Sequence, residues 1–448
     1  MPKFVKESMH LLKIRMFKFY PARFCIGLLF LFAAYFFKIT GKIYKAAGYF
    51  CWIVRVSKAG ILINTADANI RRIINAGAKD NRNQILEDFL LSDEAENLRK
   101  RYQNFSQEQR ETVRGTRLLL KEHNPLTGEK GVIALAFTDR FREFFVNHDI
   151  NEVAKNYYIV LEPSWSGYCS PYILMFINEI REVIIQCPEK KDFDFIKSLN
   201  SNLIPVGLGA SYWIDLDKFK PLEEVSKEFD IIYIATWALY KNHSRLFKAL
   251  KVLKSKGHKL RVLLVGYSWL GRKKEDVIRL MDTYGISDMC EIKERISRDE
   301  VNECLNKSKV SILLSEKEGN CRAMAESIAA GCPILIYKYN EGDAVGFVNK
   351  DTGSLCDFDE LPEALIDMVN NYDKFSPYKW AVDNIGSAQA TNKLNSILKQ
   401  IALKRGEPWA CDIYEKIGFS VKPATNNLKT NENIICNTES SLSARYRG

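Results

Sequence analysis

Two glutamates lie where a predicted strand meets a predicted helix. The apolar run 310–314 indicates a buried strand, and residues 323–330 contain strong helix formers without proline or glycine. Glu318 lies at the mouth of this junction, Gly319 follows it, and Glu326 lies two turns further along. Such a junction binds anions, because the first N–H groups of a helix have no internal partner and glycine lets the backbone approach a ligand. Phosphate binding beside carboxylates that accept hydroxyl groups indicates a sugar nucleotide.

A simpler interpretation explains these residues without a ligand. Glu318 would favour the helix dipole, and Glu326 would pair with Arg322, four residues earlier. A third charge comes from Lys241, which follows the apolar run 231–235. It is either a point charge that neutralises a diphosphate or a solvated lysine near a helix start. In an open α/β sheet, ligands bind beyond the carboxyl ends of the strands, which is where the Glu318 loop is expected to lie.

The wider pattern of motifs resembles a known family. The two glutamates, with seven residues between them and the segment 330–333 (Ala-Gly-Cys-Pro) after them, resemble the signature of the group 1 (family 4) retaining glycosyltransferases of the GT-B fold. Weaker matches follow the order of that family's donor domain, from its first strand to the turn after its fifth: 231–235, 241–243, 245–253, 262–266, 296–301 and 349–355. The resemblance covers roughly residues 228–370, a third of the chain.

This resemblance implies a fold, a reaction and a set of site residues. The fold is α/β, GT-B, with two Rossmann-like parallel-sheet domains facing a cleft. The reaction retains the configuration at the anomeric carbon and requires neither a cofactor nor a metal ion, and a nucleotide-diphosphate sugar is the co-substrate. The implied catalytic residues are Glu318, Lys241 and His148. The implied donor-binding residues are Gly319, Asn320, Cys321, Arg322, Glu326, Gly266, Glu294 and Arg295.

Within this set, individual roles follow from the family pattern. Glu318 would contact the donor sugar, and Glu326 would bind the ribose hydroxyls. The backbone amides of residues 319–321 would hold sugar hydroxyls and phosphate. Glu294 and Arg295, after the third strand of the donor domain, would meet the edge of the base.

The acceptor side is assigned to the segment 162–168, which follows a strand predicted at 157–161. Trp165 or Tyr168 would stack on a sugar or a lipid head, and a turn with packed aromatic residues is an equally good interpretation. His148 is the candidate for the N-domain histidine that the family places near the reacting sugar. A solvated loop histidine is the alternative.

The sequence also departs from the family pattern. Thr236 stands five residues before Lys241, where the family has an arginine, and Arg322 is a hypothetical substitute. A glycine-rich loop after the first N-terminal strand is missing, since residues 60–64 contain one glycine. These departures keep a non-catalytic interpretation open.

Composition places the chain among globular proteins. Its 448 residues allow two domains with appendages. The eleven cysteines are scattered singly and are odd in number, which favours a reducing compartment over a disulfide framework. The five histidines form no cluster with cysteine or aspartate that indicates a metal site.

The positive charge of the chain is concentrated at its N-terminus. Residues 1–58 contain eleven Lys/Arg and one acid, Glu7, whereas the remaining residues hold 54 of each sign. This distribution argues against a nucleic-acid surface and for an anionic membrane surface as partner. Residues 3–20 have the pattern of a basic amphipathic helix.

An uninterrupted apolar run, 24–37, follows the basic segment. As a helix it spans about 21 Å, short of the roughly 30 Å hydrocarbon core. A signal peptide is disfavoured because no small-residue cleavage site is evident. We therefore expect a helix pair that lies in or dips into the cytoplasmic leaflet, with a true span and a buried core helix as alternatives.

Strand–helix alternation from residue 131 onward predicts parallel sheets. The predicted strands of the first are 131–137, 157–161, 183–186 and 203–206, after solvated helices in 80–122. The predicted domains are a membrane-associating segment, an acceptor domain, a donor domain, returning helices and a disordered tail: 1–58, 59–222, 223–372, 373–421 and 422–448.

Together these features predict a glycosyltransferase at the cytoplasmic face of a membrane, attached peripherally or by a shallow anchor. It would transfer a sugar to a membrane-proximal polysaccharide or lipid-linked glycan. Two alternatives remain: a sugar-nucleotide epimerase, and a non-catalytic membrane scaffold of the same fold.

Overall fold

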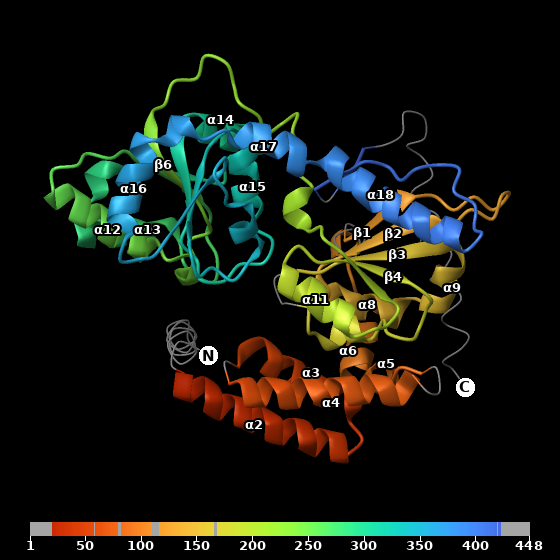
Figure 1. Cartoon of the computed structure of the whole chain (residues 1–448). Helices are drawn as coiled ribbons and strands as arrows, with labels where there is room; N and C mark the ends of the chain where they lie inside the picture. The colour runs from red at the N-terminus through yellow and green to blue at the C-terminus, as the bar shows by residue number, and fades with distance from the viewer. Residues whose placement is uncertain are drawn as a thin grey trace. The chain divides into compact units, whose positions relative to one another are not determined.

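The computed structural model describes residues 20–57, 59–78, 82–109, 116–164, 168–418 and 420–422. The helix predicted over 3–20, except Tyr20, and the tail predicted from residue 422, except Lys422, lie outside these residues. The chain divides into two compact units (Figure 1). The first comprises the chain up to Gly209 and the segment from Lys393, and the second is Ala210–Asn392. The first division falls before residue 222, where the sequence suggested the end of the acceptor domain.

A five-stranded sheet forms the centre of the first unit, with the strand order β1-β2-β3-β4-β5. The edge strand β1 is antiparallel to β2, and the other neighbours are parallel. The strands are β1 (Arg117–Lys121), β2 (Gly131–Ala136), β3 (Tyr157–Glu162), β4 (Val183–Gln186) and β5 (Leu203–Val206). The prediction of solvated helices over 80–122 is wrong for β1, because Leu118 and Leu120 are buried in this sheet.

Short helices connect the parallel strands: α8 (Thr138–Asn147), α9 (Ile150–Asn156), α10 (Pro171–Leu174) and α11 (Lys190–Ser198). Figure 1 shows α8 and α11 on one side of the sheet and α18 (Ser387–Lys404) on the other. Both faces of the sheet are therefore covered, as its largely apolar parallel strands require.

In the described part of the chain, five helices precede this sheet: α2 (Tyr20–Ile39), α3 (Ile43–Val56), α4 (Gly60–Ala78), α5 (Gln84–Leu90) and α6 (Asp93–Gln103). Buried residues of α3, including Phe50 and Ile53, belong to the same hydrophobic core as the helices that cover the five-stranded sheet. The N-terminal helices are thus packed into the first unit. Among the described residues, the window Pro21–Ile39 forms the one helix long and apolar enough to cross a membrane, with a mean hydropathy of 1.8.

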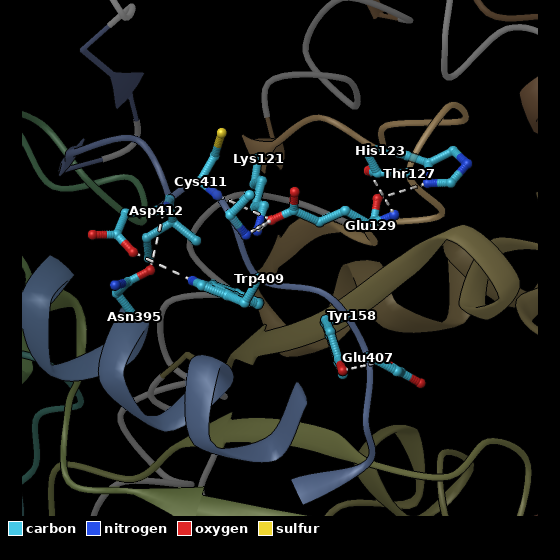
Figure 2. A network of polar contacts seen from close by, with 12 residues as sticks. Lys121, His123, Thr127, Glu129, Tyr158, Asn395, Glu407, Trp409, Cys411 and Asp412 are labelled. Atoms are coloured by element: carbon cyan, nitrogen blue, oxygen red, sulfur yellow. Dashed lines mark hydrogen bonds and ion pairs between the residues drawn. The ribbon is translucent and has the colours of Figure 1, made fainter. Parts of the chain in front are cut away.

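The C-terminal segment is anchored to the β1–β2 hairpin by a buried polar network (Figure 2). Glu129 accepts hydrogen bonds from Lys121 Nζ at 2.5 Å and from the main-chain N–H groups of Ala410 and Cys411 at 2.8 and 3.1 Å. The ammonium group of Lys121 lies 3.5 Å from the ring centre of Trp409. These hydrogen bonds connect two parts of the first unit that are 281 residues apart in the chain.

The second unit contains a six-stranded parallel sheet in the order β11-β10-β9-β6-β7-β8. Its strands are β6 (Phe229–Ile234), β7 (Val262–Gly266), β8 (Cys290–Glu294), β9 (Ser308–Leu313), β10 (Ile334–Tyr337) and β11 (Gly353–Cys356). Its helices are α12 (His243–Ser255), α13 (Lys274–Tyr284), α14 (Arg298–Asn306), α15 (Arg322–Ala329), α16 (Leu361–Asn370) and α17 (Pro377–Asn384). The chain proceeds outward from β6 in one direction and from β9 in the other, so the order reverses between these two strands.

Candidate nucleotide-sugar site

The reversal between β6 and β9 brings two predicted residues together. Lys241 follows β6 in a short 3-10 turn, and Glu318 follows β9. Lys241 Nζ donates a hydrogen bond to Glu318, and the hydroxyl of Ser315 donates to the same carboxylate oxygen. Their side chains are 13% and 12% exposed. Loops that diverge at such a point leave a crevice where ligands of open α/β sheets bind.

Several contacts hold the Lys241 turn in place. The hydroxyl of Tyr233, in β6, donates to the main-chain oxygen of Lys241. Asn242 has a left-handed φ of 57°, and its side-chain amide donates to the Leu314 oxygen at 2.9 Å. Because Leu314 directly follows β9, this bond ties the two loops to each other. The position of the Lys241 ammonium is thus set by the backbone.

Opposing influences act on the pKa of Lys241. Burial alone lowers it, but the Glu318 carboxylate raises it, and the net pKa is above its usual value. Lys241 therefore stays fully charged at neutral pH. A buried ammonium that already has its counter-ion retains two N–H directions for a diphosphate.

The Glu318 loop is fixed by the segment that follows β10. Glu318 N–H donates to Glu341 O at 2.8 Å, and Glu341 N–H donates to Glu316 O at 2.8 Å. The N–H of Cys321 donates to Asp343 Oδ1 at 2.8 Å, and Asn320 Oδ1 accepts from the Ala210 N–H at 3.1 Å. The Cys321 amide, predicted to hold the donor, is thus engaged by Asp343 in this structure.

Glu326 lies one helical turn inside α15 and is 14% exposed. Its nearest cation is Arg298 at the start of α14, whose Nη2 donates to Glu326 Oε1 at 2.8 Å. Arg322 is 3.8 Å away. Burial raises the pKa of Glu326, and the two arginines oppose that rise. The sequence alone did not single out Arg298, although its place after the third strand of this sheet was visible.

Three more predicted donor residues lie at the carboxyl ends of β7 and β8. A Cβ at Gly266 would lie 2.1 Å from Ala235 O, so only glycine fits there. Glu294 accepts hydrogen bonds from Trp237 Nε1 at 3.0 Å and from the Ser268 hydroxyl at 3.2 Å. Arg295 has a φ of 56°, and its N–H donates to Gly266 O. These residues line the same edge of the sheet as Lys241 and Glu318.

The structure also describes position 236, where this chain has threonine and the family pattern has an arginine. Thr236 follows β6, and its hydroxyl is buried without a hydrogen-bond partner. In this position it supplies no positive charge. Among the described residues, no group of three or more His, Cys, Asp or Glu side chains could hold a metal ion.

The two described site residues of the first unit, His148 and Tyr168, are buried within that unit. His148, at the end of α8, is 2% exposed, lies 2.5 Å from Arg117 and stacks on Phe144. Burial and the charge of Arg117 lower its pKa to about 3. Tyr168 is 4% exposed, and its hydroxyl donates to Gln186 O. Trp165 lies outside the described residues, and the roles of all three stay predictions.

The geometry of the second unit defines a class of protein. A parallel sheet whose reversal point carries a lysine, a glutamate and the start of a helix is the arrangement of a nucleotide-binding α/β domain.

The comparison with known families makes this class specific. Residues 215–374 match the family described as Glycosyl transferases group 1. This segment of the chain is therefore a group 1 glycosyltransferase domain, and the protein is a glycosyltransferase. The match includes the whole segment, roughly 228–370, on which the sequence resemblance rested, and confirms that resemblance.

Solved structures of glycosyltransferases are similar to the chain at low sequence identity. Sucrose-phosphate synthase from Thermosynechococcus elongatus is 14% identical, over 61% of this chain and 74% of its own, with a TM-score of 0.47. HepE of Anabaena, solved in complex with UDP, is 11% identical over 59% and 79%, with a TM-score of 0.48. S. aureus TarM is 13% identical over 59% and 55%, with a TM-score of 0.47. No protein of curated function matches the chain by sequence.

Proposed function

We propose that this protein transfers a sugar from a nucleoside-diphosphate sugar, bound at the edge of the second unit, to a glycan or lipid-linked acceptor near a membrane. The observation that carries the proposal is the buried Lys241–Glu318 pair at the reversal point of the sheet. The α15 start, Glu326 and the ends of β7 and β8 then surround one binding region. In this arrangement the two units act as a GT-B pair, with the donor on the second and the acceptor on the first.

The chemistry follows from where charge develops. When the bond between the anomeric carbon and the diphosphate breaks, negative charge grows on the leaving phosphate oxygens. Lys241 and main-chain N–H groups at the α15 start stabilise this charge in a fixed, partly dry setting. We propose that this suffices without a metal ion or other cofactor. The acceptor oxygen bonds to the anomeric carbon on the face that the diphosphate leaves, so configuration is retained, and the acceptor proton passes to the departing phosphate oxygen.

Glu318 has two tasks in this proposal. It keeps Lys241 charged and oriented, and its second carboxylate oxygen is available to a sugar hydroxyl of the donor. Glu326 binds the ribose hydroxyls through the oxygen that Arg298 does not occupy. Both carboxylates act as acceptors, which matches the hydroxyl-rich part of the donor.

Donor binding and turnover test the proposal. Isothermal titration of the purified protein with UDP-, GDP- and ADP-sugars should show selective binding of one base. Lys241→Ala should lower turnover by about 10²–10³-fold, the typical loss for one stabilising donor. Arg279→Ala is a matched control, because that cation is exposed on α13 and far from the sheet edge. Activity that survives EDTA, and a product of unchanged anomeric configuration by NMR, would support the metal-free retaining reaction.

Two outcomes favour the alternatives. Conversion of the donor without any acceptor, with an altered sugar in the product, indicates an epimerase. Absence of binding to every nucleotide sugar, by protein shown to be folded and with lipid present, indicates a non-catalytic scaffold.

A further inference from the structure

The helix α2 presents a continuous apolar face to its surroundings. Its exposed side chains recur at helical spacing: Leu28, Leu29, Phe32, Phe36 and Ile39, which are 44–84% exposed. Trp52 of α3, 43% exposed, extends this face, since its ring lies 5.7 Å from that of Phe30. Contiguous exposed apolar surface of this kind marks a binding surface for a protein or a membrane.

The charge around this face identifies the occupant. Residues 20–66 contain six Lys/Arg and no acidic residue. Lys42 and Lys45 are exposed just beyond the end of α2, and Arg23 lies near its start. An apolar face bordered by cations and aromatic side chains fits a bilayer surface that contains anionic lipids.

Length does not decide how α2 meets the bilayer. The helix has 20 residues, longer than the run 24–37 on which the sequence argument relied. At 1.5 Å per residue it measures about 30 Å, enough to span the hydrocarbon core. The packing of α2 against the neighbouring helices must therefore decide whether it spans the bilayer.

The opposite side of α2 packs mainly on α3 and also meets α4 at two places. A Cβ at Gly27 would lie 2.7 Å from Leu62, so the two helices approach closely there. Further along, the buried Asn69 of α4 accepts a hydrogen bond from Lys38 Nζ at 2.9 Å and donates to the Tyr35 hydroxyl at 3.0 Å. A spanning α2 would have to take α4 and Asn69 into the hydrocarbon with it, or break these contacts.

The helices α3 and α4 are in turn tied to the sheet of the first unit. Phe50 of α3 is fully buried in the common core. Arg71 of α4 donates to the oxygen and hydroxyl of Ser198, at the end of α11, at 2.7 and 2.9 Å. Figure 1 shows α2 on the side of α3 and α4 that faces away from the sheet. The layer of α3 and α4 cannot enter a bilayer without the sheet domain.

From this packing we infer that α2 is a monotopic helix, which lies in the plane of an anionic membrane surface and does not cross it. The inference extends the membrane part of the proposed function and is independent of its chemistry, because it concerns only the first unit. The lipid-facing surface is the row from Leu28 to Ile39, and both ends of α2 lie on the same side of the membrane.

Thiol labelling tests the position of the two ends. In a background with Cys25, Cys290 and Cys436 replaced by serine, single cysteines are introduced as Ala22→Cys or Thr40→Cys. The exposed Cys411 is kept as a marker for the side that holds the first unit. In sealed membrane vesicles of one orientation, a membrane-impermeant maleimide should react with residues 22, 40 and 411 from the same side. Labelling of residues 22 and 40 from opposite sides would show a span and overturn the inference.

Flotation with lipid vesicles tests the surface itself. Phe32→Asp should lower the vesicle-bound fraction at least tenfold on vesicles that contain 30% anionic phosphatidylglycerol, and binding should be weaker on vesicles of neutral lipid alone. Leu126→Asp is the matched control, because Leu126 is 95% exposed in a turn remote from α2. An unchanged melting temperature shows that Phe32→Asp folds. If the wild type does not bind vesicles, or if Phe32→Asp instead dissociates a dimer, the face binds something other than a membrane and the inference fails.

Discussion

Removal of both partners of the Lys241–Glu318 pair should weaken the protein no more than removal of either one alone. Both side chains are nearly buried, at 13% and 12% exposure. Replacing Lys241 with methionine leaves the Glu318 carboxylate with only the Ser315 hydroxyl, and replacing Glu318 with glutamine leaves a buried ammonium without a counter-ion. Loss of one partner of a buried pair costs about 3–5 kcal/mol.

The structure limits the size of the coupling between the two residues. Two unit charges near 4 Å attract by about 4 kcal/mol at the dielectric response typical of protein sites. Part of this is offset by desolvation, so we expect about 3 kcal/mol for each single variant. The double variant Lys241→Met/Glu318→Gln should also lose about 3 kcal/mol, which gives a coupling near 3 kcal/mol from the double-mutant cycle.

Urea unfolding of the four proteins, followed by circular dichroism without donor, measures this cycle. The exposed pair Lys254–Asp288 in the same unit serves as a control, and its cycle should show little coupling. If the losses from Lys241→Met and Glu318→Gln add up in the double variant to within about 0.5 kcal/mol, the two charges do not meet. That result would contradict the buried ion pair on which the proposed site depends.

Three further perturbations test other parts of the structure. Burial, with nearby cations, lowers the pKa of His148 and His243 to about 3, so only the unfolded chain takes up these protons between about pH 6.5 and 3. Stability should therefore fall on acidification, by about 1.3 kcal/mol per histidine from pH 7 to 5.5 in urea unfolding, and His243→Phe should reduce this slope. Gly266→Ala would place a Cβ 2.1 Å from a backbone oxygen and should cost about 3 kcal/mol or prevent folding, as soluble yield and melting temperature would show. Glu129→Gln leaves Lys121 buried without a counter-ion and should release the C-terminal segment to proteolysis near residue 410, with a loss of about 3 kcal/mol.

Local periodicity was enough to predict the sheets. The strands at 183–186, 203–206 and 262–266 have the predicted bounds, because continuous apolar runs between polar loops define strands that are buried on both faces. The strand at 117–121 was missed. Its three leucines are flanked by charged residues and follow helical segments rich in charge, and only its antiparallel pairing with 131–136 makes it a strand.

The sequence predicted those parts of the site that depend only on the order of strands and loops along the chain. Lys241 and Glu318 each follow a strand, and the parallel order of those strands brings them together. The partner of Glu326 was not predictable in this way. Helical spacing favoured Arg322, four residues earlier, but Arg298 from another helix is closer, and its position depends on how α14 and α15 pack. The burial of His148 and Tyr168 was not predictable either, because no local sequence pattern distinguishes a solvent-exposed loop side chain from one packed inside the domain.

The pairing of acids with bases determines how the donor can bind. The two carboxylates of the glutamate motif each have a cationic partner: Lys241 for Glu318, and Arg298 for Glu326. A diphosphate that approaches Lys241 must therefore share it with Glu318, which stays within hydrogen-bond reach of the same ammonium. An ammonium that contacts both groups costs less free energy than one that leaves Glu318 for the diphosphate. The lysine then needs no reorientation, and no charged group is left buried without a partner. In the proposed function, the pair that stabilises these two loops thus also preorganises them for a charged donor, and this dual role would explain why both residues lie at the point where the sheet reverses.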